Sequence, residues 1–146
     1  HAVAHGLVPL VYGDVALDAE LGGTIVSTEQ LFAYMARQLH PARLVLVTAV
    51  DGVFERDPLV DPSARAVPEI SASNWREVRA ALGSSHATDV TGGMLAKVEE
   101  MVALVREFPG LAVRIISGER QGALETALRE PMSATGGTVV TWTQRA

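Results

Sequence analysis

The stretch RLVLVTAVDGVFERDP, residues 43–58, decides the fold class of this sequence. Its first half is almost entirely Leu, Val, Ala and Thr, which predicts a strand over residues 43–50. Because polar residues do not alternate with the apolar ones, we expect this strand to be buried on both faces and not to lie at an edge. Asp51-Gly52 then turns the chain, and the proline-rich, acidic residues 57–68 predict a surface loop without regular structure.

Strand-like and helix-like segments alternate on both sides of this stretch. Short apolar runs bounded by turn residues predict strands, two of them forming a hairpin, and apolar residues three and four apart predict helices. This alternation predicts a three-layer α/β/α sandwich with a largely parallel sheet and a β-hairpin insertion, in a single domain over residues 1–146. The other expected strands are 7–12, 15–17, 24–26, 111–117 and 138–141, and the expected helices are 28–39, 74–82, 94–107 and 122–129.

Composition narrows the class of protein. The 146 residues make about one domain, and 48% hydrophobic against 20% charged residues excludes intrinsic disorder. The absence of cysteine excludes disulfides and thiolate metal sites. No apolar run approaches the roughly 20 residues that span a bilayer, and a net charge of −5 argues against nucleic-acid binding. We therefore expect a cytoplasmic protein with neither a membrane nor a nucleic acid as its partner.

A glycine-rich segment, DVTGGM at residues 89–94, precedes the longest expected helix. Gly92 and Gly93 leave backbone N–H groups accessible, and a helix N-terminus adds partial positive charge, so the segment is typical of an anion site. Lys97 is the one lysine beside eleven arginines and lies one turn into that helix, where its ammonium can reach the same anion. The residue order of a Walker A loop is absent, and a tight turn without a ligand is the alternative interpretation.

Ligands of open α/β sheets bind beyond the carboxyl ends of the strands. The loop after the strand at 43–50 brings a hydroxyl, an aromatic ring and two carboxylates to such a position. A purine ring can stack near the aromatic residue while the polar groups contact its edge and the ribose. A plain turn and a plain loop corner are the alternative interpretation. The four residues are Thr48, Asp51, Phe54 and Asp57.

Two motifs, TAVDGVFERDP at residues 48–58 and DVTGGMLAK at residues 89–97, together resemble the amino acid kinase superfamily. Two further segments, HGLVPLVYGDVALD at residues 5–18 and GGTIVS at residues 22–27, are most similar to isopentenyl phosphate kinase. The first two motifs are superfamily-wide, so they specify ATP and not the acceptor. The resemblance covers nearly the whole chain and implies the carboxy-terminal, nucleotide-binding part of the amino acid kinase fold.

The resemblance implies a role for each candidate residue. Gly13 matches a backbone contact to the acceptor phosphate, with Asp14 beside it. Lys97 would act catalytically by neutralising charge on the transferred phosphoryl group. The adenosine side of the site would be lined or shaped by Thr48, Asp51, Gly52, Phe54 and Asp57, and the ATP phosphates would be held by Gly92, Gly93 and Lys97.

The resemblance also implies partners. In that family an amino-terminal half supplies a glycine-rich loop, lysines and a histidine that grips the acceptor phosphate, and these 146 residues contain no such half. A parallel sheet without its neighbouring strands exposes an apolar edge. We therefore expect the chain to pair with an amino-terminal half or with a second copy, as a homodimer. One acid, Glu29, stands where archaeal members of the family carry an acidic pair, and it either substitutes for the pair or belongs to a plain helix start.

The implied reaction is a phosphoryl transfer from ATP to isopentenyl phosphate, giving isopentenyl diphosphate and ADP, a step of isoprenoid biosynthesis. Mg²⁺ would bridge the ATP phosphates, and no protein ligand is assigned to it. Two alternatives stay open. One is a kinase of the same superfamily with another acceptor, such as fosfomycin, UMP or an amino-acid carboxylate. The other is a nucleotide-binding module without catalytic activity.

Overall fold

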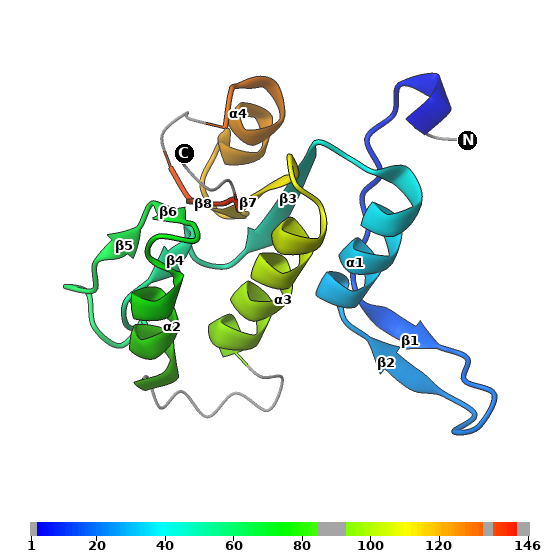
Figure 1. Cartoon of the computed structure of the whole chain (residues 1–146), viewed down its shortest axis with the longest axis horizontal. Coiled ribbons are helices and arrows are strands. Elements are labelled where there is room, and N and C mark those ends of the chain that lie inside the picture. The colour runs from blue at the N-terminus through cyan, green and yellow to red at the C-terminus, as the bar shows by residue number, and fades with distance from the viewer. Residues whose placement is uncertain (1–2, 85–92, 133–135, 143–146) are drawn as a thin grey trace. The chain divides into compact units, whose positions relative to one another are not determined.

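The computed structural model describes residues 3–84, 93–132 and 136–142. The chain forms two compact units, one of residues 1–39 and the other of residues 40–146 (Figure 1). Each unit contains its own β-structure. Within the described part of the chain, no helix is both long and apolar enough to cross a membrane.

The smaller unit contains a β-hairpin and a helix, as the sequence predicts. The Asp18 carboxylate closes the hairpin turn by accepting hydrogen bonds from the backbone N–H groups of Leu21, at 2.7 Å, and Glu20, at 2.9 Å. These bonds, the one from Leu21 foremost, hold the pKa of Asp18 below its ordinary value. The elements are a 3₁₀ helix η1 (Val3–His5), antiparallel strands β1 (Asp14–Ala16) and β2 (Thr24–Val26), and helix α1 (Thr28–Leu39).

Helix α1 begins with a reciprocal pair of hydrogen bonds. The backbone N–H of Ser27 donates to Gln30 Oε1 at 2.9 Å, and the N–H of Gln30 donates to Ser27 Oγ at 3.1 Å. Both bonds occupy donors that a helix start otherwise leaves without a partner inside the helix. The helix ends before Pro41, which cannot continue it.

The prediction of a strand at residues 7–12 is wrong in this structure. The segment forms no strand, and most of its apolar side chains are exposed, with Leu10 86% and Tyr12 73% accessible. A strand requires a neighbour that satisfies its backbone N–H and C=O groups, and none of the described strands pairs with this segment. An apolar run therefore indicates that a segment can be buried, but it does not show which strand, if any, pairs with that segment.

The larger unit is built on a four-stranded mixed sheet. Its order is β3-β7-β8-β6. β3 and β7 are parallel, as are β6 and β8, whereas β7 and β8 are antiparallel. The strands are β3 (Arg43–Thr48), β6 (Glu69–Ile70), β7 (Ala112–Ser117) and β8 (Thr138–Val140). A small antiparallel hairpin of β4 (Val53–Phe54) and β5 (Ala66–Val67) lies within residues 51–68, part of which was expected to be an irregular loop.

Helices cover this sheet, which confirms the predicted α/β class. Helix α4 packs on β3 and β7, and Ile116 of β7 joins Ala123 and Ala127 of α4 in one buried cluster. Because successive strand residues face opposite sides, Ile115 points to the other face, on the side of α3, which packs against β7 and β8 (Figure 1). The helices are α2 (Trp75–Ser84), α3 (Gly93–Glu107) and α4 (Ala123–Arg129).

Strand β3 is an edge strand of the described sheet, and the prediction that it is buried on both faces is wrong. It pairs with β7 alone. Only Leu46 is buried on it, and Val47 is 43% exposed. β7 is the strand that fits the prediction, because it has a neighbour on each side. Arg43 at the start of β3 donates from Nη1 to the carbonyls of Ala127 and Glu130 at 2.8 Å, which satisfies the carboxyl end of α4.

Candidate functional site

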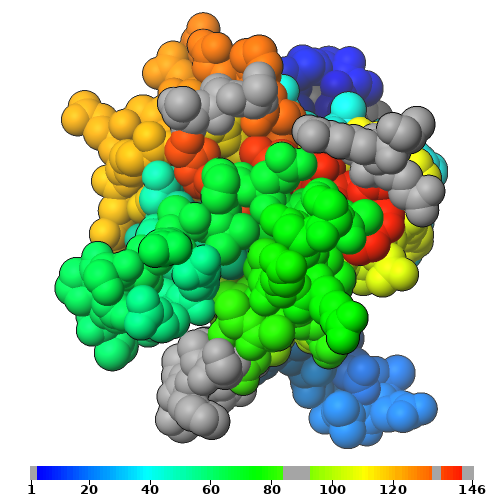
Figure 2. All heavy atoms as spheres, turned by 60° about the vertical axis from the view of Figure 1, so that its left-hand side comes forward, coloured from blue at the N-terminus to red at the C-terminus, as the bar shows by residue number. Residues whose placement is uncertain are grey.

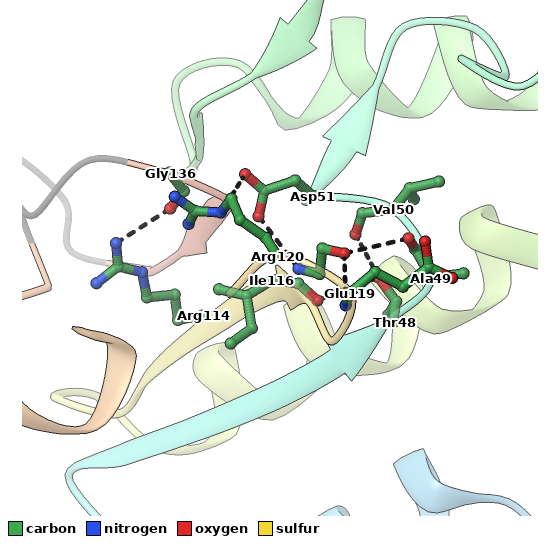
Figure 3. A network of polar contacts seen from close by, with 10 residues as sticks. Thr48, Ala49, Val50, Asp51, Arg114, Ile116, Glu119, Arg120 and Gly136 are labelled. Atoms are coloured by element: carbon green, nitrogen blue, oxygen red, sulfur yellow. Dashed lines mark hydrogen bonds and ion pairs between the residues drawn. The ribbon is translucent and has the colours of Figure 1, made fainter. Parts of the chain in front are cut away.

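The turn after β3 is tied to the carboxyl end of β7 by the carboxylate of Asp51. Oδ1 accepts a hydrogen bond from the backbone N–H of Ser117 at 3.1 Å, and Oδ2 lies 3.2 Å from Nε of Arg120 (Figure 3). Ser117 is the last residue of β7 and pairs with Thr48 of β3, and Arg120 follows three residues later. The Asp51 side chain therefore shapes the loop from within the protein, and its two oxygens already have protein partners.

Hydroxyl groups complete this connection between the two strand ends. Thr48 Oγ1 donates to the carbonyl of Val50 at 2.7 Å, and the carbonyl of Thr48 accepts from the N–H of Gly118 at 2.8 Å. Ser117 Oγ donates to the carbonyl of Ala49 at 3.2 Å and accepts from the N–H of Glu119 at 3.1 Å (Figure 3). Such a network, linked across two strands, holds the loop backbone in one conformation.

Gly52 occupies a position that no other residue fits. Its φ is +100°, in the left-handed region, and a Cβ built there would lie 2.6 Å from Thr138 Oγ1 and 2.8 Å from the carbonyl carbon of Gly137. The turn therefore packs its backbone directly on the start of β8. Thr138 Oγ1 also accepts from the N–H of Val53 at 2.7 Å and donates to the carbonyl of Val67 at 2.6 Å.

Phe54 and Asp57 lie on the hairpin that follows. Phe54 is on β4, paired with Ala66, and is partly exposed. Asp57 Oδ1 accepts from the N–H of Leu59 at 2.9 Å, and the Asp57 carbonyl accepts from the N–H of Asp61 at 2.9 Å, so Asp57 begins a compact turn. Figure 2 shows the blue-green residues between β4 and β5 projecting from one side of this unit.

The predicted anion site is partly within the described residues. Gly92, with residues 89–91 before it, lies outside them. Gly93 opens α3 with a φ of +61°, and Lys97 is half-buried in the same helix. In Figure 1, α3 runs back against the direction of β3, so that the helix begins toward the side to which the β3 arrow points. This orientation directs the N-terminus of α3 toward the carboxyl edge of the sheet.

The predicted acceptor residues belong to the smaller unit. The backbone N–H of Gly13 donates to Thr28 Oγ1 at 3.0 Å, and a Cβ at Gly13 would lie 2.5 Å from the carbonyl oxygen of Val26. Asp14 begins β1 and is exposed, its Oδ1 accepting from the N–H of Val15 at 2.7 Å. Close packing between the start of the hairpin and the start of α1 explains why glycine stands at position 13.

Known proteins with similar sequences define the family. The sequence profile of the amino acid kinase family matches residues 1–117. The chain belongs to the amino acid kinase family. The isopentenyl phosphate kinase of Methanothermobacter thermautotrophicus is 38% identical over 125 residues, covering 84% of this chain and 45% of that protein. The enzyme of the same name from Haloferax volcanii is 42% identical over 99 residues, covering 68% of this chain and 37% of that protein.

Solved structures agree with this family. A crystal structure of isopentenyl phosphate kinase superposes with a TM-score of 0.67 at 31% identity, covering 94% of this chain and 47% of that one. UMP kinase from Ureaplasma parvum, at 16% identity and a TM-score of 0.52, shares the fold. This amino acid kinase chain thus spans less than half the length of the curated relatives described above.

Sequence reasoning on this kinase-family chain missed three residues of the site. The loop after β3 is held by Ser117, Arg120 and Thr138, which are all distant from it in the sequence. Ser117 lies 66 residues from Asp51, and Thr138 lies 85 residues from Val53. The local signal in the sequence is the Gly136-Gly137 pair before Thr138, which indicates a turn there. In the structure both glycines have a positive φ. Among the described residues, no group of three or more His, Asp or Glu could hold a metal ion.

Proposed function

We propose that this chain is the ATP-binding part of a kinase that phosphorylates isopentenyl phosphate to isopentenyl diphosphate. The observation that carries the proposal is the similarity, over most of the chain, to several proteins named isopentenyl phosphate kinase, including one at 38% identity over 125 residues. The geometry supports it, because the loop after β3 is held rigidly at the carboxyl edge of a parallel strand pair, where α/β proteins bind ligands.

We assign a different part of the two substrates to each group of candidate residues. We assign adenosine binding to Thr48, Phe54 and Asp57, on a loop whose shape is set by Asp51 and Gly52. We assign the ATP phosphates to the amino-terminal end of α3, where free backbone N–H groups and the helix dipole favour anions. This group consists of Gly92, Gly93 and Lys97, and the acceptor phosphate is assigned to Gly13 and Asp14.

The transfer itself needs charge stabilisation more than proton removal. An oxygen of the acceptor phosphate, already ionised near neutral pH, attacks the γ-phosphorus, and the bond from that phosphorus to the β–γ bridging oxygen breaks to release ADP. We assign to Lys97 the neutralisation of negative charge on the moving phosphoryl group. Mg²⁺ would enter with ATP, held chiefly by phosphates and water, and it would supply positive charge to the transferred group.

We further propose that this chain is completed by an amino-terminal half, which supplies the rest of the acceptor site, or by a second copy of the chain in a homodimer. The edge position of β3 in the described sheet supports this, because an edge strand is a template for another strand. The same proposal places the enzyme in the cytoplasm, in isoprenoid biosynthesis.

The test is ADP release by the intact enzyme that contains this chain, supplied with ATP, Mg²⁺ and isopentenyl phosphate. UMP, fosfomycin and glutamate serve as rival acceptors in parallel reactions. We expect release at a high kcat/KM with isopentenyl phosphate and at least a hundredfold lower values with the others. A higher kcat/KM with any rival acceptor would show that the assigned acceptor is wrong, and the assignment of kinase activity would stand.

A second candidate keeps phosphoryl transfer and changes the acceptor to an amino-acid carboxylate. It rests on the similarity to glutamate 5-kinase of Clostridium acetobutylicum, 27% identical over 125 residues and covering 85% of this chain. The glutamate reaction above decides between the two. ATP binding without turnover on any acceptor would instead favour the module without catalytic activity.

A further inference from the structure

We propose that Thr138 is a positioning residue, whose hydroxyl holds the hairpin that carries Phe54 and Asp57 in the geometry that binds ATP. The inference rests on the proposed function, and it deepens the assignment of that loop. Thr138 opens β8, far along the sequence from the nucleotide loop, and belongs to neither of the two motifs that resemble the kinase superfamily.

The hydroxyl of Thr138 joins both strands of the hairpin to the sheet. Oγ1 accepts the N–H of Val53 on β4 at 2.7 Å and donates to the carbonyl of Val67 on β5 at 2.6 Å. Thr138 is 1% exposed and Val53 is fully buried, so water does not replace these bonds easily. A hydroxyl is the smallest side-chain group that both donates and accepts, which limits this position to Thr and Ser among residues of its size.

The hairpin depends on the two hydrogen bonds of Thr138 because it is very short. Its ladder consists of the pairs Val53 with Val67 and Phe54 with Ala66. An isolated two-stranded hairpin is at best marginally stable in water. The Thr138 hydroxyl binds both members of the first pair, so it fixes the backbone one residue before Phe54.

The contact of Gly52 with β8 acts in the same direction. The backbone of Gly52 packs on the Gly137–Thr138 peptide with no space for a Cβ. Residues 52 and 53 are therefore seated on β8 by a steric contact and by a hydrogen bond. Loss of the hydroxyl leaves the steric contact intact and removes the partners of the N–H of Val53, which is buried, and of the carbonyl of Val67, which is partly buried. An unpaired polar group in a buried position is costly.

The test substitutes Thr138→Val, which keeps the side-chain volume and removes the hydroxyl, in the intact enzyme. Amide hydrogen exchange and steady-state kinetics are measured on the same preparation. We expect exchange at Val53 to accelerate about tenfold or more, and the KM for ATP to rise about tenfold. We expect kcat and the KM for the acceptor to stay within about twofold, and Thr138→Ser to restore the KM for ATP.

Matched controls separate positioning from general stability. Thr126→Val makes the same chemical change on α4, which is part of the same unit, and should leave the KM for ATP unchanged. If Thr138→Val does not fold, the pair Thr138→Ser and Thr138→Ala isolates the hydroxyl at smaller volume. Accelerated exchange at Val53 with an unchanged KM for ATP would contradict the positioning role. Unchanged exchange at Val53 would show that the Thr138 hydroxyl does not hold the hairpin. A wild-type enzyme that binds no ATP would instead show that the proposed function is wrong, and the inference would fall with it.

Discussion

Strands β3 and β7 are alike in sequence and differ in burial. Each is six residues long, and they pair in parallel from Arg43 with Ala112 to Thr48 with Ser117. β7 buries five of its six residues, with Ile115 fully inaccessible, whereas β3 buries only Leu46. The difference arises because β7 lies between two strands and two helices, while β3 has one strand neighbour in the described sheet.

This difference teaches that the two strands serve the protein in different ways. β7 is the centre of the core, and its substitutions should act on stability. β3 leads into the candidate nucleotide loop, and substitutions around its carboxyl end should act on ligand binding and turnover. The following predictions test that division, starting with the largest expected effect.

Lys97→Ala should lower kcat of the intact enzyme by about a thousandfold, if its charge has the proposed role at the transferred phosphoryl group. Loss of such a charge costs on the order of 4 kcal/mol. The free energy of unfolding should change little, since Lys97 is only half-buried. Lys97→Arg is the matched control that keeps the charge and changes its shape. Steady-state kinetics measures the change in kcat, and urea unfolding measures the change in stability. An unchanged kcat for Lys97→Ala would contradict a catalytic role for Lys97.

Val113→Ala on β7 should lower the free energy of unfolding by about 2–3 kcal/mol, because it opens a cavity in a fully buried site. Val47→Ala on β3 makes the same chemical change at a residue that is 43% exposed, and should cost less than about 1 kcal/mol in the 146-residue chain. Urea unfolding of both variants gives the comparison. In the intact enzyme the cost of Val47→Ala should rise toward that of Val113→Ala if another strand covers β3, and equal costs in both proteins would contradict such pairing.

Asp51→Asn should raise the KM for ATP severalfold and lower the free energy of unfolding by about 0.5–1 kcal/mol. The amide can still accept from Ser117, but it loses the ion pair with Arg120, and both side chains of that pair are partly solvated. Arg120→Gln should have the same effect, and the double variant should add little to either. Additive effects of the two substitutions would show that the ion pair does not act as a unit.

The smallest effect concerns the loop of Asp57 and Asp61. Hydrogen bonds from the hydroxyl and N–H of Ser63 lower the pKa of Asp61, and the ion pair with Arg56 at 2.8 Å acts in the same direction. A lowered folded-state pKa stabilises the loop above the unfolded pKa of about 3.9, and this contribution is lost as the pH falls through the folded value. The protection factor for amide exchange at Ser63, which is the intrinsic rate divided by the observed rate, should therefore be constant from neutral pH to about pH 5 and fall below about pH 4. Asp61→Asn should abolish this fall.

Local patterns in the sequence predict most elements and several site residues. The hairpin around Asp18, the helix that begins at Thr28 and the strand at residues 112–117 all follow from turn residues, capping residues and apolar runs. The two-residue strands β4, β5 and β6 escaped prediction, because pairs of residues carry no periodicity. The predicted strand at residues 7–12 failed for the opposite reason, since its apolar pattern is clear but no described strand pairs with it.

The sequence by itself determined the α/β class, the family and the residue types of the loop that follows β3, because these depend on local patterns and motifs. Only the tertiary structure decided which strand is central, which side chains tie the loop in place, and why Gly52 admits no Cβ. Those features depend on contacts such as Thr138 with Val53, 85 residues apart, and Asp51 with Ser117, 66 residues apart. Hydrogen bonds over such separations exist only once β7 has paired in parallel with β3 and antiparallel with β8, and no local pattern encodes them.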